Sequence, residues 1–155
     1  MLEIKGNIWD YYDRGFIISV TTNGNIDKNG NAIMGAGIAG QAAKKFPDIR
    51  KMLGTVLNEF GNIPYYFPDL RILTIPTKNE VWKPSSLLLI EKGCEWLKRF
   101  ADGHEDIVIE EKNKPTKICV TRFGTLNGGL NWIHVKPIMN KYLDDRFICV
   151  DLLNK

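Results

Sequence analysis

The sequence is poor in cysteine, and its few cysteines follow no pattern that would build a disulfide framework or a zinc site. Cys94, Cys119 and Cys149 are odd in number, lie far apart and form no CxxC motif. Free cysteines in this arrangement are typical of the reducing cytoplasm, where they usually pack as small hydrophobic groups. We therefore predict three buried thiols in a cytoplasmic protein.

Long apolar runs and signal-like segments are also missing. No stretch approaches the roughly 18 apolar residues of a membrane helix, and the first nine residues lack the basic and apolar regions of a secretory signal. The formal net charge of +3 is too mild for a general polyanion binder. The sequence has no Ser-His-Asp arrangement and no cluster of histidines with carboxylates, which argues against a metal hydrolase. We predict a soluble monomer with no metal, no cofactor and no membrane partner.

With 44% hydrophobic residues, the chain has enough apolar side chains to form the core of a single domain over residues 1–155. Several predicted strands are nearly continuous apolar runs, as in strands covered on both faces. The predicted strands are 1–5, 16–21, 65–67, 71–75, 107–109, 117–121 and 147–152. The predicted helices are 38–46, 48–60, 86–100 and a last one with Trp132, Val135, Met139 and Tyr142 on one face. This alternation predicts an α/β fold, with a mixed, mostly parallel sheet between helical layers and ligands at the carboxyl ends of its strands.

Two glycine-rich loops each follow a predicted strand and precede a predicted helix. They are TTNGNIDKNGNAIMGAGIAG at residues 21–40 and FGTLNGGLNW at residues 123–132. Glycine lets the backbone approach a ligand closely, and a helix N-terminus offers free N–H groups to an anion. Two such loops side by side would cradle a diphosphate, although glycines and asparagines at these positions also suit ordinary turns. Neither GxGxxG with an acidic ribose reader nor GxxxxGK[ST] is present, so the loops do not indicate a Rossmann site or a P-loop.

Five short motifs resemble, in order, those of the macro domain family. They are KGNI at residues 5–8, MGAGIA at 34–39, PTKNEVWKP at 76–84, GTLNGGLNW at 124–132 and VKP at 135–137. The resemblance is to the branch that contains the antitoxins that remove ADP-ribose from DNA and the terminal ADP-ribose protein glycohydrolases. It implies a three-layer α/β/α macro domain that binds ADP-ribose.

The resemblance also implies where the ligand would lie. Asn7 and Ile8 match the position that meets the adenine, where this chain carries an amide in place of the family's acid. Asn29 or Asn23 would orient the distal ribose, and Lys78 matches the lysine that the branch uses in catalysis, so Lys78 and Asn29 are the predicted catalytic residues. The remaining predicted ligand contacts lie in two phosphate-binding segments, residues 34–38 and 124–130, and at Phe123. They are Met34, Gly35, Ala36, Gly37, Ile38, Phe123, Gly124, Thr125, Leu126, Asn127, Gly128, Gly129 and Leu130.

The function implied by the resemblance is hydrolysis of an ADP-ribosyl linkage, with ADP-ribosylated protein, DNA or a small ester as substrate. A lysine beside the anomeric carbon of the distal ribose can act as a nucleophile or a proton donor. Three alternatives stay open: a phosphatase for ADP-ribose 1″-phosphate, a non-catalytic module that reads or sequesters ADP-ribose, and a general nucleic-acid binder.

Overall fold

A computed structural model describes residues 1–103, 108–109, 114–115 and 117–152. Its central sheet has the strand order β1-β8-β7-β2-β4-β3, and all neighbouring strands are parallel except the antiparallel pair of β3 and β4. This is the mixed, mostly parallel sheet that the sequence predicted. The strands of this sheet are β1 (Leu2–Gly6), β2 (Ile17–Thr22), β3 (Tyr65–Phe67), β4 (Ile72–Pro76), β7 (Ile118–Val120) and β8 (Phe147–Leu152).

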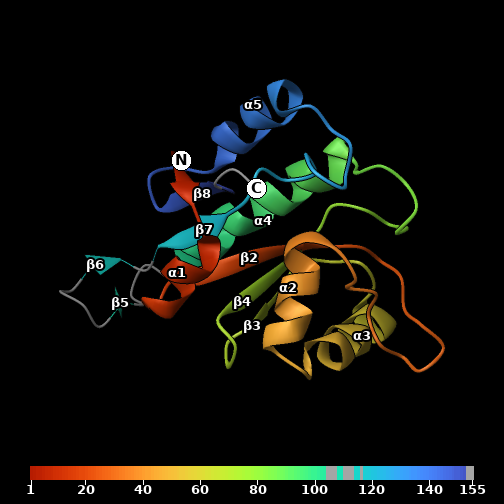
Figure 1. Cartoon of the computed structure of the whole chain (residues 1–155). Coiled ribbons are helices and arrows are strands. Elements are labelled where there is room, and N and C mark those ends of the chain that lie inside the picture. Colours follow the sequence, from red (N-terminus) through yellow and green to blue (C-terminus); the bar gives the residue numbers. More distant parts are fainter. Residues whose placement is uncertain (104–107, 110–113, 116, 153–155) are drawn as a thin grey trace.

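Helices cover both faces of the sheet (Figure 1). One layer consists of α1 (Ile8–Asp13), α2 (Gly37–Lys45) and α3 (Ile49–Phe60), and the other of α4 (Leu87–Gly103) and α5 (Trp132–Tyr142). The predicted three-layer α/β/α arrangement is therefore confirmed. Within the described ranges, no helix combines the length and apolar content needed to cross a bilayer.

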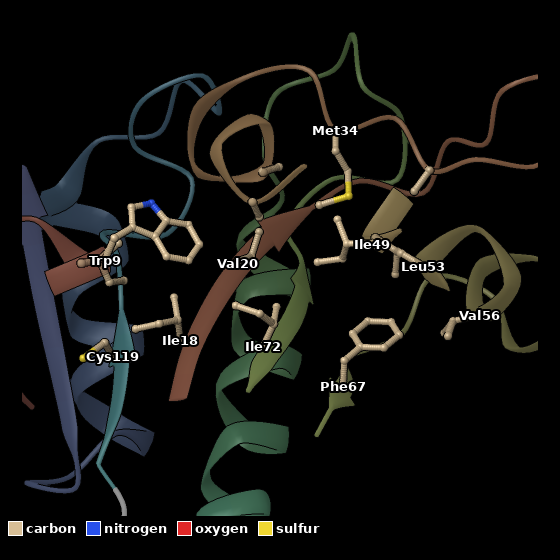
Figure 2. Close-up of a cluster of buried hydrophobic side chains, with 14 of the residues drawn as sticks. Trp9, Ile18, Val20, Met34, Ile49, Leu53, Val56, Phe67, Ile72 and Cys119 are labelled. Atoms are coloured by element: carbon tan, nitrogen blue, oxygen red, sulfur yellow. The ribbon is translucent and has the colours of Figure 1, made fainter. Parts of the chain in front are cut away.

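The two faces of the sheet bury separate apolar clusters, which is why the strands read as continuous apolar runs. On β2, Ile18 and Val20 face the first helical layer, whereas Ile17 faces the second. Figure 2 shows Ile18, Val20 and Ile72 on the sheet, with Ile49 beside them from α3. The three cysteines are fully buried in these clusters, as predicted.

Two features differ from the sequence-based prediction. The helix α1 was not predicted, because its six residues are too few to show a helical repeat. The strand predicted at 107–109 corresponds to β5 (Val108–Ile109), which pairs with β6 (Lys114–Pro115) in a separate two-stranded sheet; Ile107 lies outside the described residues.

Candidate functional site

A cavity of about 560 Å³ opens along the carboxyl ends of the parallel strands. Its walls come from residues at or just after five neighbouring strands: Ile8 after β1, Leu152 in β8, Arg122 after β7, Asn23 after β2 and Lys78 after β4. Neighbouring strands lie about 4.8 Å apart, so the four spacings from β1 to β4 span about 19 Å. The cavity is therefore elongated, with Lys78 towards one end and Ile8 at the other.

The N-terminus of α2 forms part of the middle of this cavity. Gly37, Ile38 and Ala39, the first residues of the helix, all line it. Ala36 is the N-cap and offers no side-chain hydrogen bond, while Gly37 takes a positive φ of 57°. The first turn carries no acidic residue. The N–H groups and the positive end of the helix dipole are thus available to an anion.

The second glycine-rich loop faces α2 across the cavity, and its shape depends on two glycines. Gly124 has a φ of 71°, and its carbonyl oxygen accepts a hydrogen bond from Leu130 N at 2.9 Å. A Cβ on Gly128 would collide with Ser85 Oγ and with the Gly124 carbonyl oxygen. The following helix is capped by Asn131, whose side chain accepts from Ile133 N. This loop therefore contributes through its own backbone rather than through a free helix N-terminus.

Lys78 joins the segment after β4 to the second loop. Its Nζ donates to the carbonyl oxygens of Val81 at 3.3 Å and of Asn127 at 3.2 Å. Asn62 Nδ2 donates to the Lys78 carbonyl at 2.9 Å, and Val81 N donates to Asn25 Oδ1 at 2.6 Å. The lysine thus sits on a backbone held by two asparagine side chains from other parts of the chain.

The structure brings most of the predicted site residues together around one cavity. The predicted residues that line it are Ile8, Asn23, Met34, Gly35, Ala36, Gly37, Ile38, Lys78, Gly124, Thr125, Leu126, Asn127 and Gly128. Gly129 and Leu130 also belong to the second loop but are not among the lining residues.

Three predicted residues are used elsewhere. Asn7 is exposed and caps α1, since its Oδ1 accepts from Trp9 N at 3.0 Å. Asn29 is exposed at the tip of the first loop, and its backbone N–H donates to Asp27 Oδ1. Phe123 is fully buried in the apolar cluster under α4 and α5, so its ring packs in the core. None of the three lines the cavity.

Sequence reasoning missed a pair of charged residues that line the cavity at β7 and β8. Asp151 in β8 and Arg122 after β7 both line the cavity, and Arg122 Nη2 lies 3.5 Å from Asp151 Oδ2. The Arg122 guanidinium also lies over the Trp132 ring, 4.9 Å from its centroid. The signal was available, because the carboxyl ends of parallel strands meet at one edge, and Asp151 is the next-to-last residue of an apolar strand.

Structural similarity, rather than sequence similarity, relates this chain to known proteins. No protein-family model matches the chain, and no curated protein sequence matches it significantly. The solved structures that resemble it include Thermosipho africanus DarTG in complex with ADP-ribose, at 24% identity and a TM-score of 0.72 over 97% of this chain. The chain spans 41% of the length of that protein.

Two further structures cover nearly all of both chains. The macrodomain of Thermus aquaticus DarG is 21% identical with a TM-score of 0.70, over 99% of this chain and 97% of that one. The macrodomain of Mycobacterium tuberculosis DarG is 19% identical with a TM-score of 0.69, over 99% of each chain. These TM-scores and the three-layer topology confirm the predicted architecture, and the chain has the macrodomain fold.

Proposed function

We propose that the cavity binds ADP-ribose. The observation that carries this proposal is the order of chemical groups along the cavity: a polar and apolar end at β1 and β8, two anion-binding loops in the middle, and Lys78 with Asn23 at the β2 and β4 end. A base, a diphosphate and a distal ribose follow one another in the same order along ADP-ribose. The similar Thermosipho protein, whose structure contains ADP-ribose, supports this assignment.

The diphosphate would lie between the α2 N-terminus and the second glycine-rich loop. Gly35 leaves open space where a Cβ would stand, so the ligand can approach the backbone closely there. The helix dipole favours a negative charge at the N-terminus of α2. Two basic residues, Lys44 and Lys45, lie in the last turn, at the opposite end of the helix.

The distal ribose would then lie against Asn23 and Lys78. Asn23 Nδ2 donates to the Ile33 carbonyl at 3.0 Å, and its Oδ1 accepts from Asn25 N at 2.9 Å. An amide has two donor hydrogens and two acceptor lone pairs, so Asn23 keeps one of each for ribose hydroxyls. Asn23 therefore replaces Asn29 as the residue that we propose to orient this ribose.

The reaction that we propose is hydrolysis of the bond between C1″ of the distal ribose and its acceptor. As the nucleophile, the neutral Lys78 amine bonds to C1″ while the bond to the acceptor breaks and the acceptor takes up a proton; the ribose ring opens to an imine, and water hydrolyses the imine and regenerates the lysine. As the proton donor, Lys78 protonates the departing acceptor while water attacks C1″, and the proton that the water loses restores the lysine. The two loops would supply the rest of catalysis by holding C1″ beside the lysine.

A non-catalytic reader of ADP-ribose is the second candidate, because of the surroundings of Lys78. Its ammonium group already donates to two carbonyl oxygens. Among the described lining residues, the only carboxylate is Asp151, three strands away from β4. A lysine without a nearby acid suits a binding role as well as a catalytic one.

Calorimetric titration with ADP-ribose tests binding. We expect one-to-one binding that Gly35→Leu abolishes, because the new side chain enters the space proposed for the diphosphate. Gly103→Leu is the matched control, since Gly103 also has open space at its Cβ position and lies outside the cavity. Absence of binding at millimolar ADP-ribose would refute the central proposal.

Turnover of ADP-ribosylated DNA, ADP-ribosylated protein and an ADP-ribosyl ester separates the hydrolase from the reader. For a hydrolase, we expect Lys78→Ala and Lys78→Arg to lose turnover while they keep binding ADP-ribose. Borohydride reduction during turnover, followed by mass spectrometry, distinguishes a nucleophile, which leaves an adduct on Lys78, from a proton donor, which leaves none. A parent protein that binds ADP-ribose but turns over none of these substrates would support the reader, and phosphate release from ADP-ribose 1″-phosphate would indicate the phosphatase.

A further inference from the structure

We propose that Asn62 is a positioning residue for Lys78. Its side-chain amide holds the peptide that carries the lysine, and this sets where the lysine amine stands at C1″ of the distal ribose. The inference rests on the proposed function, because it assumes that Lys78 acts in the hydrolysis. Asn62 does not line the cavity, so it acts through the lysine and not on the ligand.

The end of α3 gives Asn62 a defined position. The helix ends at Phe60, and Gly61 follows with a φ of 88°, in the region that favours glycine. Gly61 N donates to the Leu57 carbonyl at 3.0 Å, and Ile63 N donates to the Gly61 carbonyl at 3.1 Å. The backbone is therefore held on both sides of Asn62.

Both amide hydrogens of Asn62 are used on the segment that carries the lysine. Its Nδ2 donates to the Lys78 carbonyl at 2.9 Å and to Asn79 Oδ1 at 3.0 Å. An amide nitrogen has two hydrogens, so these two bonds account for both. The first bond reaches the backbone of the lysine itself, and it therefore fixes the peptide plane that follows the Lys78 Cα.

The first glycine-rich loop packs against the same contact. Gly24 N donates to the Asn79 carbonyl at 3.1 Å. A Cβ on Gly24 would lie 2.6 Å from that oxygen and 3.1 Å from Asn62 Cγ. The first loop, the end of α3 and the segment after β4 therefore meet beside Lys78 with little room for a shift.

Lys78 needs this support because its side chain is a long and flexible stem. Its Nζ donates to the carbonyl oxygens of Val81 and Asn127, and these bonds hold only the far end of the stem. The bond from Asn62 holds the near end. Misplacement of a reacting group by about 1 Å can cost about 100-fold in rate. Loss of the Asn62 amide should therefore lower the rate of the chemical step and leave the affinity for the ligand unchanged.

Steady-state turnover of an ADP-ribosylated substrate tests this on Asn62→Ala and Asn62→Asp. We expect kcat to fall about tenfold or more in both variants, with KM within about twofold of the parent value. The aspartate keeps the size of the side chain but loses its N–H donors, so a role in packing alone would leave Asn62→Asp close to the parent protein. Melting temperatures and calorimetry with ADP-ribose check that the fold and the cavity are intact.

Asn79→Ala is the matched control. It removes the second acceptor of the Asn62 amide and keeps the bond to the Lys78 carbonyl, and Asn79 is exposed outside the cavity. We expect its kcat to stay within about twofold of the parent value. An equal loss of kcat in Asn79→Ala and Asn62→Ala would overturn the inference, because the bond to the lysine would not be the cause.

Three other outcomes would also overturn it. Unchanged kcat in Asn62→Ala, or in Asn62→Asp, would leave the proposed function intact and remove the role of the Asn62 donor. Loss of ADP-ribose affinity in parallel with kcat would show that Asn62 supports the whole cavity and not the lysine. A parent protein that turns over no substrate would refute the proposed hydrolase itself, and the inference with it.

Discussion

Replacing Gly128 by alanine should disrupt the second loop, whereas the same replacement at Gly35 should not. The Cβ added at position 128 would collide with the Gly124 carbonyl, which is backbone and cannot rotate away, as well as with Ser85 Oγ. Relieving such an overlap typically costs about 1–3 kcal/mol, and the collision with backbone favours the upper part of that range. For a chain of this size, each kcal/mol lowers the melting temperature by about 2–4 °C. We therefore expect Gly128→Ala to melt roughly 4–12 °C below the parent protein.

The consequence for ligand binding follows from the bonds that the loop makes. Gly128 O accepts from Ser85 N at 2.9 Å, and this bond ties the loop to the segment that carries Lys78. Displacement of the loop should break this bond and lower the affinity for ADP-ribose by about tenfold or more. Gly35→Ala enters open space and should change stability by less than about 0.5 kcal/mol. Scanning fluorimetry and calorimetry on both variants decide the matter: equal melting temperatures and equal affinities would refute the collision argument.

Three further predictions concern the segment after β4, the first glycine-rich loop and the buried thiols. Asn25→Ala should speed amide hydrogen exchange at Val81 by about tenfold, because it removes the acceptor of the Val81 N–H; unchanged exchange would mean that this bond does not hold the segment. Hydrogen bonds from the backbone N–H groups of Asn31 and Asn29, together with Arg50, lower the pKa of Asp27. A lowered pKa stabilises the folded state above the unfolded value of 3.8, and this contribution disappears as the pH falls through the folded value. Thermal melts should therefore show Asp27→Asn less stable than the parent protein at pH 7 and equal to it in strong acid, and a difference that persisted in acid would contradict this assignment. Finally, burial raises the pKa of the thiols of Cys94, Cys119 and Cys149 to about 12. Iodoacetamide should therefore alkylate none of the three in the folded protein and all of them in denaturant, as measured by mass spectrometry. Rapid alkylation of the native protein would contradict their burial.

The central sheet could be predicted from the sequence because its strands are buried on both faces. Runs such as those of β2 and β8 are apolar at nearly every position, which distinguishes them from half-exposed strands and from amphipathic helices. Short elements gave no comparable signal. The six residues of α1 make less than two turns, and its start depends on the Asn7 cap and on packing of Ile8 and Trp9 against the sheet.

The site could be predicted to the level of loops but not of side chains. Glycines after strands mark places where the backbone needs unusual freedom, and Gly37 and Gly124 do adopt positive φ. Which end of the cavity holds which group depends on strand order, and the order β1-β8-β7-β2-β4-β3 is not that of the sequence. Asp151 therefore stayed unnoticed at the end of the chain, although the sheet places it beside residues that follow β1 and β7.

The asparagines of this chain show why a polar residue near a glycine-rich loop is not thereby a ligand contact. Asn7 and Asn131 each use the side-chain oxygen to cap a helix, and Asn25 uses its own to hold Val81 N. None of these three side chains lines the cavity, so their hydrogen bonds support the local backbone. Asn23 differs because it lines the cavity with one donor and one acceptor to spare. We therefore expect recognition of the proposed ligand to rest mainly on backbone N–H groups, on Asn23 and on Lys78.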